Sequence, residues 1–407
     1  MKNFKKVLAV VMAIALIVTC FAACGDNKPD EPDVKTVKAA LICLHGDSST
    51  YDKNFIDAFK QACANKGLTA DDYTIVTDIP EGTACYDQAA DLAESYDLIF
   101  ADSFGHEPYM IQAAKEFPEV EFCHATGTKA HTEKLANYHN AFASIYEGRY
   151  LAGVAAGMKL VELYGDAEGK VSDENAKIGY VGAFPYAEVI SGYTSFYLGA
   201  KSVVENATME VRYTNSWYDE AAEKTTALAL IDNGCKLISQ HADSWGAPTA
   251  CEERNIPNVS YNGSTVEKCP NTFIIASRIN WTPYFEYIID CVQNDKAIDT
   301  DWTGSIGTGS VEITALGTAA AKGTQEKLDA VKAGLKEGTI KVFDCSTFTV
   351  EGKPLTSFVA DVDDAGDFVP ETEVVEKSGD ITFVNESAKR SAPYFNIIID
   401  GITAITE

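Results

Sequence analysis

The residues best placed to do chemistry follow two predicted β-strands. Trp217 comes after residues 208–214, which are rich in β-forming side chains, and His241 and Asp243 follow a shorter strand predicted over residues 236–240. Open α/β sheets bind small molecules outside the carboxyl ends of their parallel strands. A small-molecule site at that edge is therefore the first functional hypothesis.

Catalytic and metal-binding chemistry has weaker support. His241, Asp243 and Ser244 are the residue types of a catalytic triad, but consecutive side chains at a strand end diverge, and no G-x-S-x-G motif accompanies them. No H-x-x-x-H or C-x-x-C spacing occurs, and the glycine-rich residues 304–309 lack the Walker lysine and the Rossmann spacing. We predict no enzyme, no metal and no cofactor, although acid–base catalysis by buried carboxylates stays open.

Further aromatic and polar side chains fall at or just after predicted strand ends. Aromatic rings in equivalent positions of two lobes could line a common cleft and stack on a flat ring system, each contributing about 1–3 kcal/mol. Polar groups between them would then select the ligand, because an unpaired buried polar group costs about 1–3 kcal/mol. The aromatic candidates are Tyr51, Phe104, Tyr186, Trp217, Trp245 and Trp281, and the polar ones are Asp47, Ser103, Asp243, Asn262 and Asn280.

Two series of alternating strands and helices must position these side chains. Apolar runs at residues 37–44, 73–77, 97–101 and 120–124 alternate with amphipathic helical patterns, and a similar series begins at residue 178. This alternation predicts parallel sheets with right-handed crossovers and two lobes. The predicted segments are lobe 1 at residues 37–144 plus 272–298, lobe 2 at 145–271 plus 299–337, and a β-rich C-terminal elaboration at 338–407.

The N-terminus has the pattern of a bacterial lipoprotein leader. Lys2, Lys5 and Lys6 precede the apolar run 7–18, and small residues lead to Cys24. We predict a signal peptide over residues 1–23, lipidation at Cys24, a flexible tether over 24–36 and a location on the extracytoplasmic face of the cell membrane. An unmodified signal peptide is the alternative.

Charge and cysteine content narrow the class of protein further. The formal net charge is −27, which repels phosphate backbones, so nucleic acid is an unfavourable partner. Nine of the eleven cysteines follow Cys24, an odd number without clustered spacing. Several lie inside apolar runs, as Cys43 and Cys123 do, so the pattern indicates buried free thiols rather than a disulfide framework.

Residues 97–127, 146–157 and 178–203, together with the NSWYD, ALIDNG and QHADS segments between residues 215 and 244, form a distinctive set of motifs. Through them, residues 37–320 resemble the basic membrane protein family of lipoproteins, which are purine- and nucleoside-binding receptors of ABC importers. This resemblance implies a type I periplasmic-binding-protein fold, in which two Rossmann-like lobes enclose a ligand cleft. Ser49 and Gly105, in the loops that match, complete the set of candidate ligand-binding residues.

The departures from the family bear on the ligand. Nucleoside-binding members usually carry an aspartate motif for the ribose hydroxyls where this chain has Asn262, and a lysine where it has Asn280. The resemblance therefore implies a purine-like ligand, with a free base such as adenine favoured over a nucleoside, and an ABC permease as the partner. A ligand-sensing surface lipoprotein and a nucleoside hydrolase are the alternatives.

Overall fold

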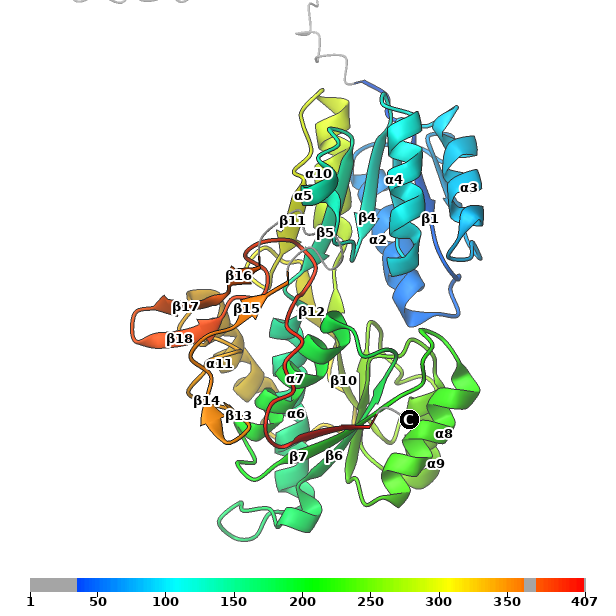
Figure 1. Cartoon of the computed structure of the whole chain (residues 1–407). Coiled ribbons are helices and arrows are strands. Elements are labelled where there is room, and N and C mark those ends of the chain that lie inside the picture. Colours follow the sequence, from blue (N-terminus) through cyan, green and yellow to red (C-terminus); the bar gives the residue numbers. More distant parts are fainter. Residues whose placement is uncertain (1–34, 362–370, 406–407) are drawn as a thin grey trace, which may run out of the picture. The chain divides into compact units, whose positions relative to one another are not determined.

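The computed structural model describes residues 35–361 and 371–405 (Figure 1). The predicted signal peptide, Cys24 and nearly all of the predicted tether lie outside the described residues. Among the described residues, no helix is both long and apolar enough to cross a bilayer.

Lobe 1 is built on a six-stranded parallel sheet in the order β2-β1-β3-β4-β5-β11. Helices α2 and α10 pack together on one face, and α3 and α4 on the other. The strands are β1 Ala39–Ile42, β2 Tyr73–Val76, β3 Leu98–Ala101, β4 Glu121–Ala125, β5 Tyr138–Ala143 and β11 Asp301–Gly304; the helices are α2 Thr50–Asn65, α3 Thr83–Ala93, α4 Glu107–Glu116, α5 Ala130–Glu133 and α10 Thr282–Gln293.

Lobe 2 is built on a seven-stranded sheet in the order β12-β10-β9-β8-β6-β7-β19, parallel except where β12 joins β10. Helices α6 and α7 pack together in one core, and α8 and α9 in a separate one. The strands are β6 Lys177–Gly182, β7 Thr208–Tyr213, β8 Leu237–Gln240, β9 Asn258–Tyr261, β10 Phe273–Ile279, β12 Val311–Ile313 and β19 Ile402–Ile405; the helices are α6 Ile145–Tyr164, α7 Ala187–Lys201, α8 Glu220–Asp232, α9 Gly246–Arg254 and α11 Thr324–Glu337.

The chain crosses between the lobes three times, and the crossings correct the predicted lobe boundaries. The strand β10, predicted for lobe 1, pairs with β9 in lobe 2, whereas the following helix α10 packs on α2 in lobe 1. The strand β11, whose residues were assigned to lobe 2 without a strand being predicted there, pairs with β5 in lobe 1, and the chain then returns to lobe 2 at β12. The position of a strand depends on local sequence, whereas its pairing partner does not, so the βα pattern could not show which sheet each segment joins.

Helices α6 and α7 approach each other backbone to backbone. A Cβ added at Gly153 would overlap the Phe196 carbonyl oxygen, and one at Gly199 would overlap the Tyr150 carbonyl oxygen. Neither position therefore has room for a larger residue. This close contact holds the C-terminal half of α7 against α6, the helix that leads in from lobe 1.

The C-terminal part of the chain attaches to both lobes. It contains three two-stranded antiparallel sheets and then β19, which extends the lobe 2 sheet beside β7 (Figure 1). Between them, the backbone N–H and hydroxyl of Ser391 both donate to the Asp301 carboxylate of β11, 2.8 Å away. The short strands are β13 Thr349–Val350, β14 Lys353–Pro354, β15 Val359–Ala360, β16 Thr372–Glu373, β17 Val375–Ser378 and β18 Ile381–Val384.

All nine cysteines in the described part of the chain are buried and free. The prediction of buried thiols is therefore confirmed for these residues.

Candidate functional site

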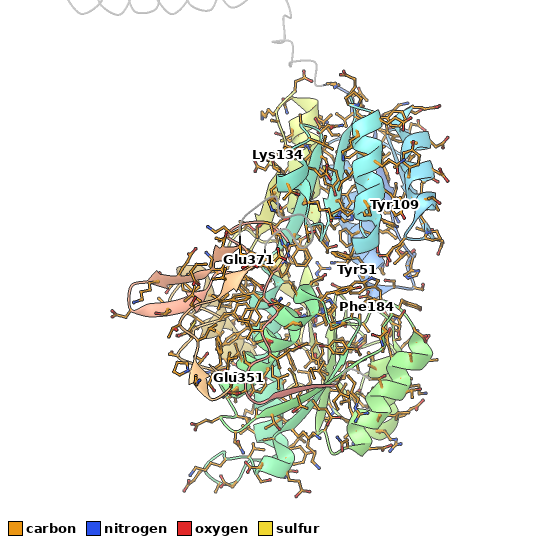
Figure 2. All side chains as sticks on the ribbon, viewed as in Figure 1. Tyr51, Tyr109, Lys134, Phe184, Glu351 and Glu371 are labelled. Carbon is orange, nitrogen blue, oxygen red and sulfur yellow. The ribbon has the colours of Figure 1, made fainter. Side chains whose placement is uncertain are left out.

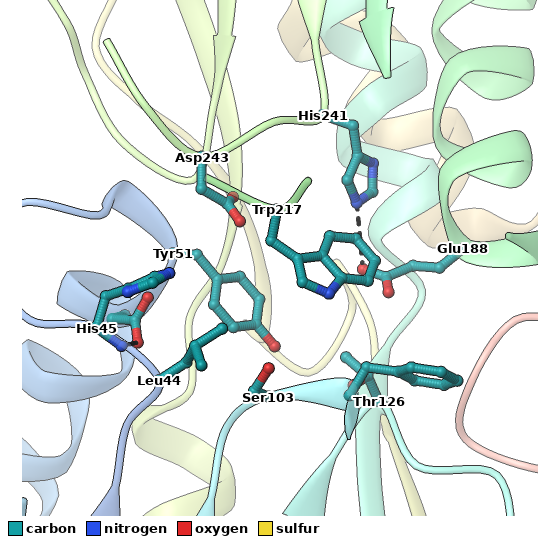
Figure 3. Close-up of a pocket in the computed structure, with 11 residues that line it drawn as sticks. Leu44, His45, Tyr51, Ser103, Thr126, Glu188, Trp217, His241 and Asp243 are labelled. Atoms are coloured by element: carbon teal, nitrogen blue, oxygen red, sulfur yellow. Dashed lines mark hydrogen bonds and ion pairs between the residues drawn. The ribbon is translucent and has the colours of Figure 1, made fainter. Parts of the chain in front are cut away.

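A pocket lies where the carboxyl ends of the two sheets face each other (Figure 3). It holds about 380 Å³ of space free of atoms, counting its open mouth. Both lobes contribute side chains, and Figure 2 shows Tyr51 and Phe184 on the two sides. The lining residues are Leu44, His45, Tyr51, Asp52, Ser103, Phe104, Thr126, Glu188, Trp217, His241 and Asp243.

Lobe 1 contributes the loops after β1, β3 and β4, and the first turn of α2. Ser49 begins α2, because its hydroxyl accepts the Asp52 N–H at 3.2 Å. This first turn places Tyr51 over the pocket, and the Tyr51 hydroxyl donates to the Asp102 carbonyl oxygen at 2.7 Å. The β1–β3 boundary is also the point where the strand order reverses, the usual ligand position in such sheets.

Lobe 2 contributes Trp217 from the loop after β7, Asp243 from the loop after β8 and Glu188 from the first turn of α7. The Trp217 ring is half-buried and contacts the rings of Phe184 and Tyr186. Its remaining surface is available to a ligand, so the pocket offers an aromatic wall beside two carboxylates.

A buried hydrogen-bonded chain orients Glu188. The Arg149 guanidinium lies 3.3 Å from the centre of the Tyr261 ring and donates to Nδ1 of His241 at 3.1 Å. Burial lowers the pKa of His241 and keeps the ring neutral, so Nδ1 accepts and Nε2 carries the proton. Nε2 then faces the Glu188 carboxylate at 3.4 Å, which fixes an acceptor at the pocket wall.

Burial also raises the pKa of two carboxyl groups at the pocket. The pKa of Asp243 is raised well above its usual value, mainly by burial and then by the negative charge of Asp52. The pKa of Asp102, beneath Tyr51, is raised in the same way. A carboxyl group in such a position can stay protonated and donate a hydrogen bond, so Asp243 can serve ring nitrogens as donor or acceptor.

Side-chain atoms of Cys43, Asp52 and Asp102 that could bind a metal ion lie within 4.8 Å of one another. Burial, followed by the charge of Asp102, raises the pKa of the Cys43 thiol well above its usual value. Metals bind the thiolate, which this environment disfavours. The backbone N–H groups of Leu44 and His45 already donate to the two carboxylates. We assign no metal here, and the prediction of no metal stays a prediction.

Five of the predicted site residues line the pocket. They are Tyr51, Ser103, Phe104, Trp217 and Asp243. That they bind a ligand stays a prediction. Tyr186 is 44% exposed and stands outside this pocket, against Phe104 of the opposite lobe, with ring centres 5.6 Å apart.

Three other predicted residues in lobe 1 do not line the pocket. Asp47 is exposed, and Ser49 is buried as the cap of α2. The backbone N–H of Gly105 donates to Glu81 at 2.8 Å. Ser49 and Gly105 therefore shape the loops that carry Tyr51 and Phe104.

The remaining predicted residues are also placed elsewhere. Asn262 is buried behind the pocket and donates to Asp243 at 3.3 Å, so it positions that carboxyl group. Asn280 donates to the Gly309 carbonyl oxygen at 3.1 Å, in the crossing region. The prediction that Trp281 lines the cleft is wrong. Its ring is 1% exposed in the core between α2 and α10, stacked on Phe55 with ring centres 4.4 Å apart.

Sequence reasoning did not assign six of the lining residues to the ligand. Asp52 and Glu188 lie in the first turn of the helix after a strand, one and two residues from the candidates Tyr51 and Tyr186. Leu44 and His45 end the first apolar run, Thr126 follows β4 with φ of 64°, and His241 follows β8. Both carboxylates lie in segments that the sequence places after strand ends, but there the aromatic neighbours were chosen instead.

This arrangement, with two α/β lobes and a pocket at the facing strand ends, is the fold of ABC transporter solute-binding proteins. Such a protein from Aeropyrum pernix superimposes with a TM-score of 0.62 at 15% identity, covering 75% of this chain and 93% of its own. One from Conexibacter woesei gives a TM-score of 0.59 at 20% identity, covering 75% and 98%. The predicted fold class is confirmed.

The chain belongs to the Bmp family, described as PnrA-like ABC transporter substrate-binding proteins, which matches residues 83–343. The family indicated by the sequence is thus confirmed. Because this is a family of binding proteins, the prediction that the chain is not an enzyme also holds.

Individual relatives carry different ligand names. A Brucella abortus purine-binding protein is 37% identical over 46% of this chain and 49% of its own length. A Haloferax volcanii protein, named as a candidate ABC transporter glucose-binding protein, is 30% identical over 66% and 65%. A Lactococcus lactis ABC transporter nucleoside-binding protein is 28% identical over 40% and 41%. The chain thus spans half to two thirds of the length of the first two.

Proposed function

We propose that this protein binds a purine-like ring between its lobes as the substrate-binding component of an ABC importer. The observation that carries the proposal is the lining of the pocket, where Tyr51, Phe104 and Trp217 supply aromatic surface. Ser103 and Asp243 supply polar groups beside them. A flat heterocycle with ring nitrogens uses both kinds of group, whereas a pocket for an anion would need cationic side chains. Relatives named as purine- and nucleoside-binding proteins support the same ligand class.

Binding would couple to closure of the lobes, because ligand contacts to both lobes select the closed state. The Asp243 carbonyl oxygen accepts both the Thr50 backbone N–H at 3.2 Å and its hydroxyl at 3.0 Å, across the lobes. Such contacts would present one closed surface to a membrane permease. No covalent chemistry is required.

Whether the ligand is a free purine base or a nucleoside is a separate question. A free base such as adenine was favoured over a nucleoside because Asn262 and Asn280 replace the family's ribose partners. In the structure Asn262 lies behind Asp243, and Asn280 bonds to the crossing region, so neither residue lines the pocket. The argument for a free base therefore loses its basis, and base and nucleoside have to be compared directly.

Isothermal titration calorimetry tests the purine proposal. Purified protein without the leader is titrated with adenine, guanine, adenosine and guanosine, and with glucose because of the ligand named for one relative. We expect micromolar or tighter binding of at least one purine compound. Flat titrations with all four, or binding of glucose alone, would remove the purine assignment.

We further propose that the protein is anchored to the cell membrane through a lipid on Cys24. The support is the leader pattern before this residue. Fatty-acid labelling of the full chain should be lost in Cys24→Ser. A variant at the neighbouring cysteine, Cys20→Ser, is the control and should keep the label. Unchanged labelling of Cys24→Ser would exclude the anchor at this residue.

A further inference from the structure

Three side chains that line the pocket carry a hydroxyl group, and the hydrogen-bond partner of each decides what it can offer to a ligand. They are Tyr51, Ser103 and Thr126. The Tyr51 hydroxyl donates to the Asp102 carbonyl oxygen at 2.7 Å, and the Thr126 hydroxyl donates to the Ala125 carbonyl oxygen at 2.6 Å. Because a carbonyl oxygen can only accept, both hydroxyl protons are already in use.

The Ser103 hydroxyl is bonded to a carboxylate that does not itself line the pocket. The side chain of Ser103 is buried, and its hydroxyl donates to Oε1 of Glu81 at 2.7 Å. Glu81 lies in the loop between β2 and α3. An ionised carboxylate has no hydrogen to donate, so the proton between the two oxygens belongs to Ser103. Ser103 therefore presents only its lone pairs to the pocket.

A second hydrogen bond holds the Glu81 carboxylate in this position. The same oxygen of Glu81 accepts the backbone N–H of Gly105 at 2.8 Å. Gly105 also leaves the necessary room, because a Cβ added there would lie 2.4 Å from the carboxyl carbon of Glu81. Hydrogen bonds to an ionised group are stronger than bonds between neutral groups. The Ser103 proton is thus kept turned away from the pocket.

The hydroxyl oxygens of Tyr51, Ser103 and Thr126 together make an acceptor surface on the lobe 1 side of the pocket. Figure 3 shows the hydroxyl ends of Tyr51 and Ser103 on this side, and Tyr51 is bonded to the residue just before Ser103. An exocyclic amino group can donate its N–H bonds to such oxygens. An oxo group in the same place would meet lone pairs with its own lone pairs and stay unpaired, which is costly in a buried site.

We infer that Glu81 is a positioning residue for ligand selection. By holding the Ser103 proton, it makes the pocket select purines that carry an exocyclic amino group over purines that carry none. This inference rests on the proposed function and names which purines the site prefers. Glu81 acts through Ser103, from a loop that contributes no side chain to the pocket lining.

Calorimetry with adenine, guanine and hypoxanthine, and with adenosine, guanosine and inosine, tests this selection, because hypoxanthine and inosine carry no amino group. The best amino compound should bind about tenfold or more tightly than its counterpart without the amino group. In Glu81→Ala the Ser103 hydroxyl can turn and donate to a ligand oxygen, so this ratio of affinities should fall by about threefold or more. Ser103→Ala should weaken binding of the amino compound and leave its counterpart within about twofold.

The matched control is Glu116→Ala. Glu116 is an exposed glutamate of lobe 1, as Glu81 is, and it accepts the hydroxyl proton of Tyr86 outside the pocket lining. Its loss should leave the ratio unchanged. A residue that only supports its loop would weaken both ligands alike, so an unchanged ratio in Glu81→Ala would overturn the inference. Hypoxanthine or inosine binding as tightly as the amino compounds would also overturn it, while the purine site would stand. If no purine compound binds, both are wrong.

Discussion

At the scale of single residues, Trp217 is the side chain on which the purine proposal depends most. Its half-buried ring faces the pocket and is held from behind by Phe184. We expect Trp217→Ala to weaken binding of the best purine ligand at least about tenfold, because a stacked base contributes about 1–3 kcal/mol. Calorimetry measures the loss, and circular dichroism should show an unchanged fold.

The control for Trp217→Ala is a second tryptophan at a strand end. Trp245 is also half-buried and packs under the Lys268 ammonium at 4.3 Å, but it lines no part of the pocket. Trp245→Ala should leave affinity unchanged. Equal losses in both variants would mean that Trp217 acts through general packing.

Glu386 makes the stability of the folded protein depend on pH. Burial raises its pKa from 4.5 to about 8 in the folded protein, so the folded state binds a proton that the unfolded state releases. Stability therefore falls as pH rises from about 4.5 to about 8. Glu386→Gln keeps an acceptor for the Ser191 hydroxyl and removes this loss. The melting temperature of the variant relative to the natural protein should rise between pH 5 and pH 8.

Other buried acids, such as Glu147 and Glu223, with pKa values raised to about 7, titrate in the same range. Glu147 and Glu223 are present in both the natural protein and Glu386→Gln. The difference between their two melting temperatures therefore reports the ionisation of Glu386 alone. A melting-temperature difference that stays constant across this pH range would show that Glu386 ionises as easily folded as unfolded.

The sequence predicted five pocket residues from one rule, namely that ligand-binding side chains lie at or just after the ends of the predicted strands. Tyr51, Ser103, Phe104, Trp217 and Asp243 follow strand ends or open the next helix, and all of them line the pocket. The same rule failed for Trp281, because that residue precedes α10 with its ring turned into the core. The direction of a side chain at a helix start depends on what the helix packs against, which is not local information.

At the scale of elements, the close contact between α6 and α7 leads to a prediction about the free energy of unfolding. Gly199→Ala should destabilise the protein by about 1–3 kcal/mol, because the added methyl group forces the two backbones apart at the Tyr150 carbonyl oxygen. Urea unfolding measures this change. Gly307→Ala is the control, since a Cβ at that exposed glycine would meet only the Ser305 side-chain oxygen at 3.4 Å, an ordinary contact, and its φ is not positive, so the change should be nearly neutral.

A different result at Gly199 would be informative about the same contact. If Gly199→Ala unfolds at the same urea concentration as the natural protein, the helices can separate at little cost, and close approach is not what holds α7 in place.

The secondary structure of both lobes was largely predictable, since most strands are short apolar runs and helices such as α2 and α10 have a 3.6-residue pattern of apolar side chains. The strand β10 was predicted but was assigned to the wrong lobe, whereas β11 was not predicted as a strand and its residues were assigned to lobe 2. Each is followed by a crossing, and a strand carries no local mark of the sheet that it joins. The C-terminal segment gave no usable pattern, because its position depends on Asp301 and Ser191, far away in sequence.

At the scale of the whole molecule, ligand binding should stabilise the protein by mass action. A purine compound at one hundred times its dissociation constant should add about 2.7 kcal/mol if it binds only the folded state. Thermal unfolding at increasing adenosine concentration measures this. A melting temperature that does not change with adenosine, in a protein that binds it by calorimetry, would mean that the unfolded chain binds it equally.

The strand β19 has a consequence for the order of folding. It lies beside β7 in the lobe 2 sheet, yet β8 to β12, α11 and all the short hairpins separate the two in the chain. Until residues 402–405 have been synthesised, β7 remains an open edge, with unpaired backbone groups that another chain could join. A nascent chain therefore carries β7 as an uncovered edge for the second half of its synthesis, and β19, the last strand of the sheet to be made, covers β7 and becomes the terminal strand itself.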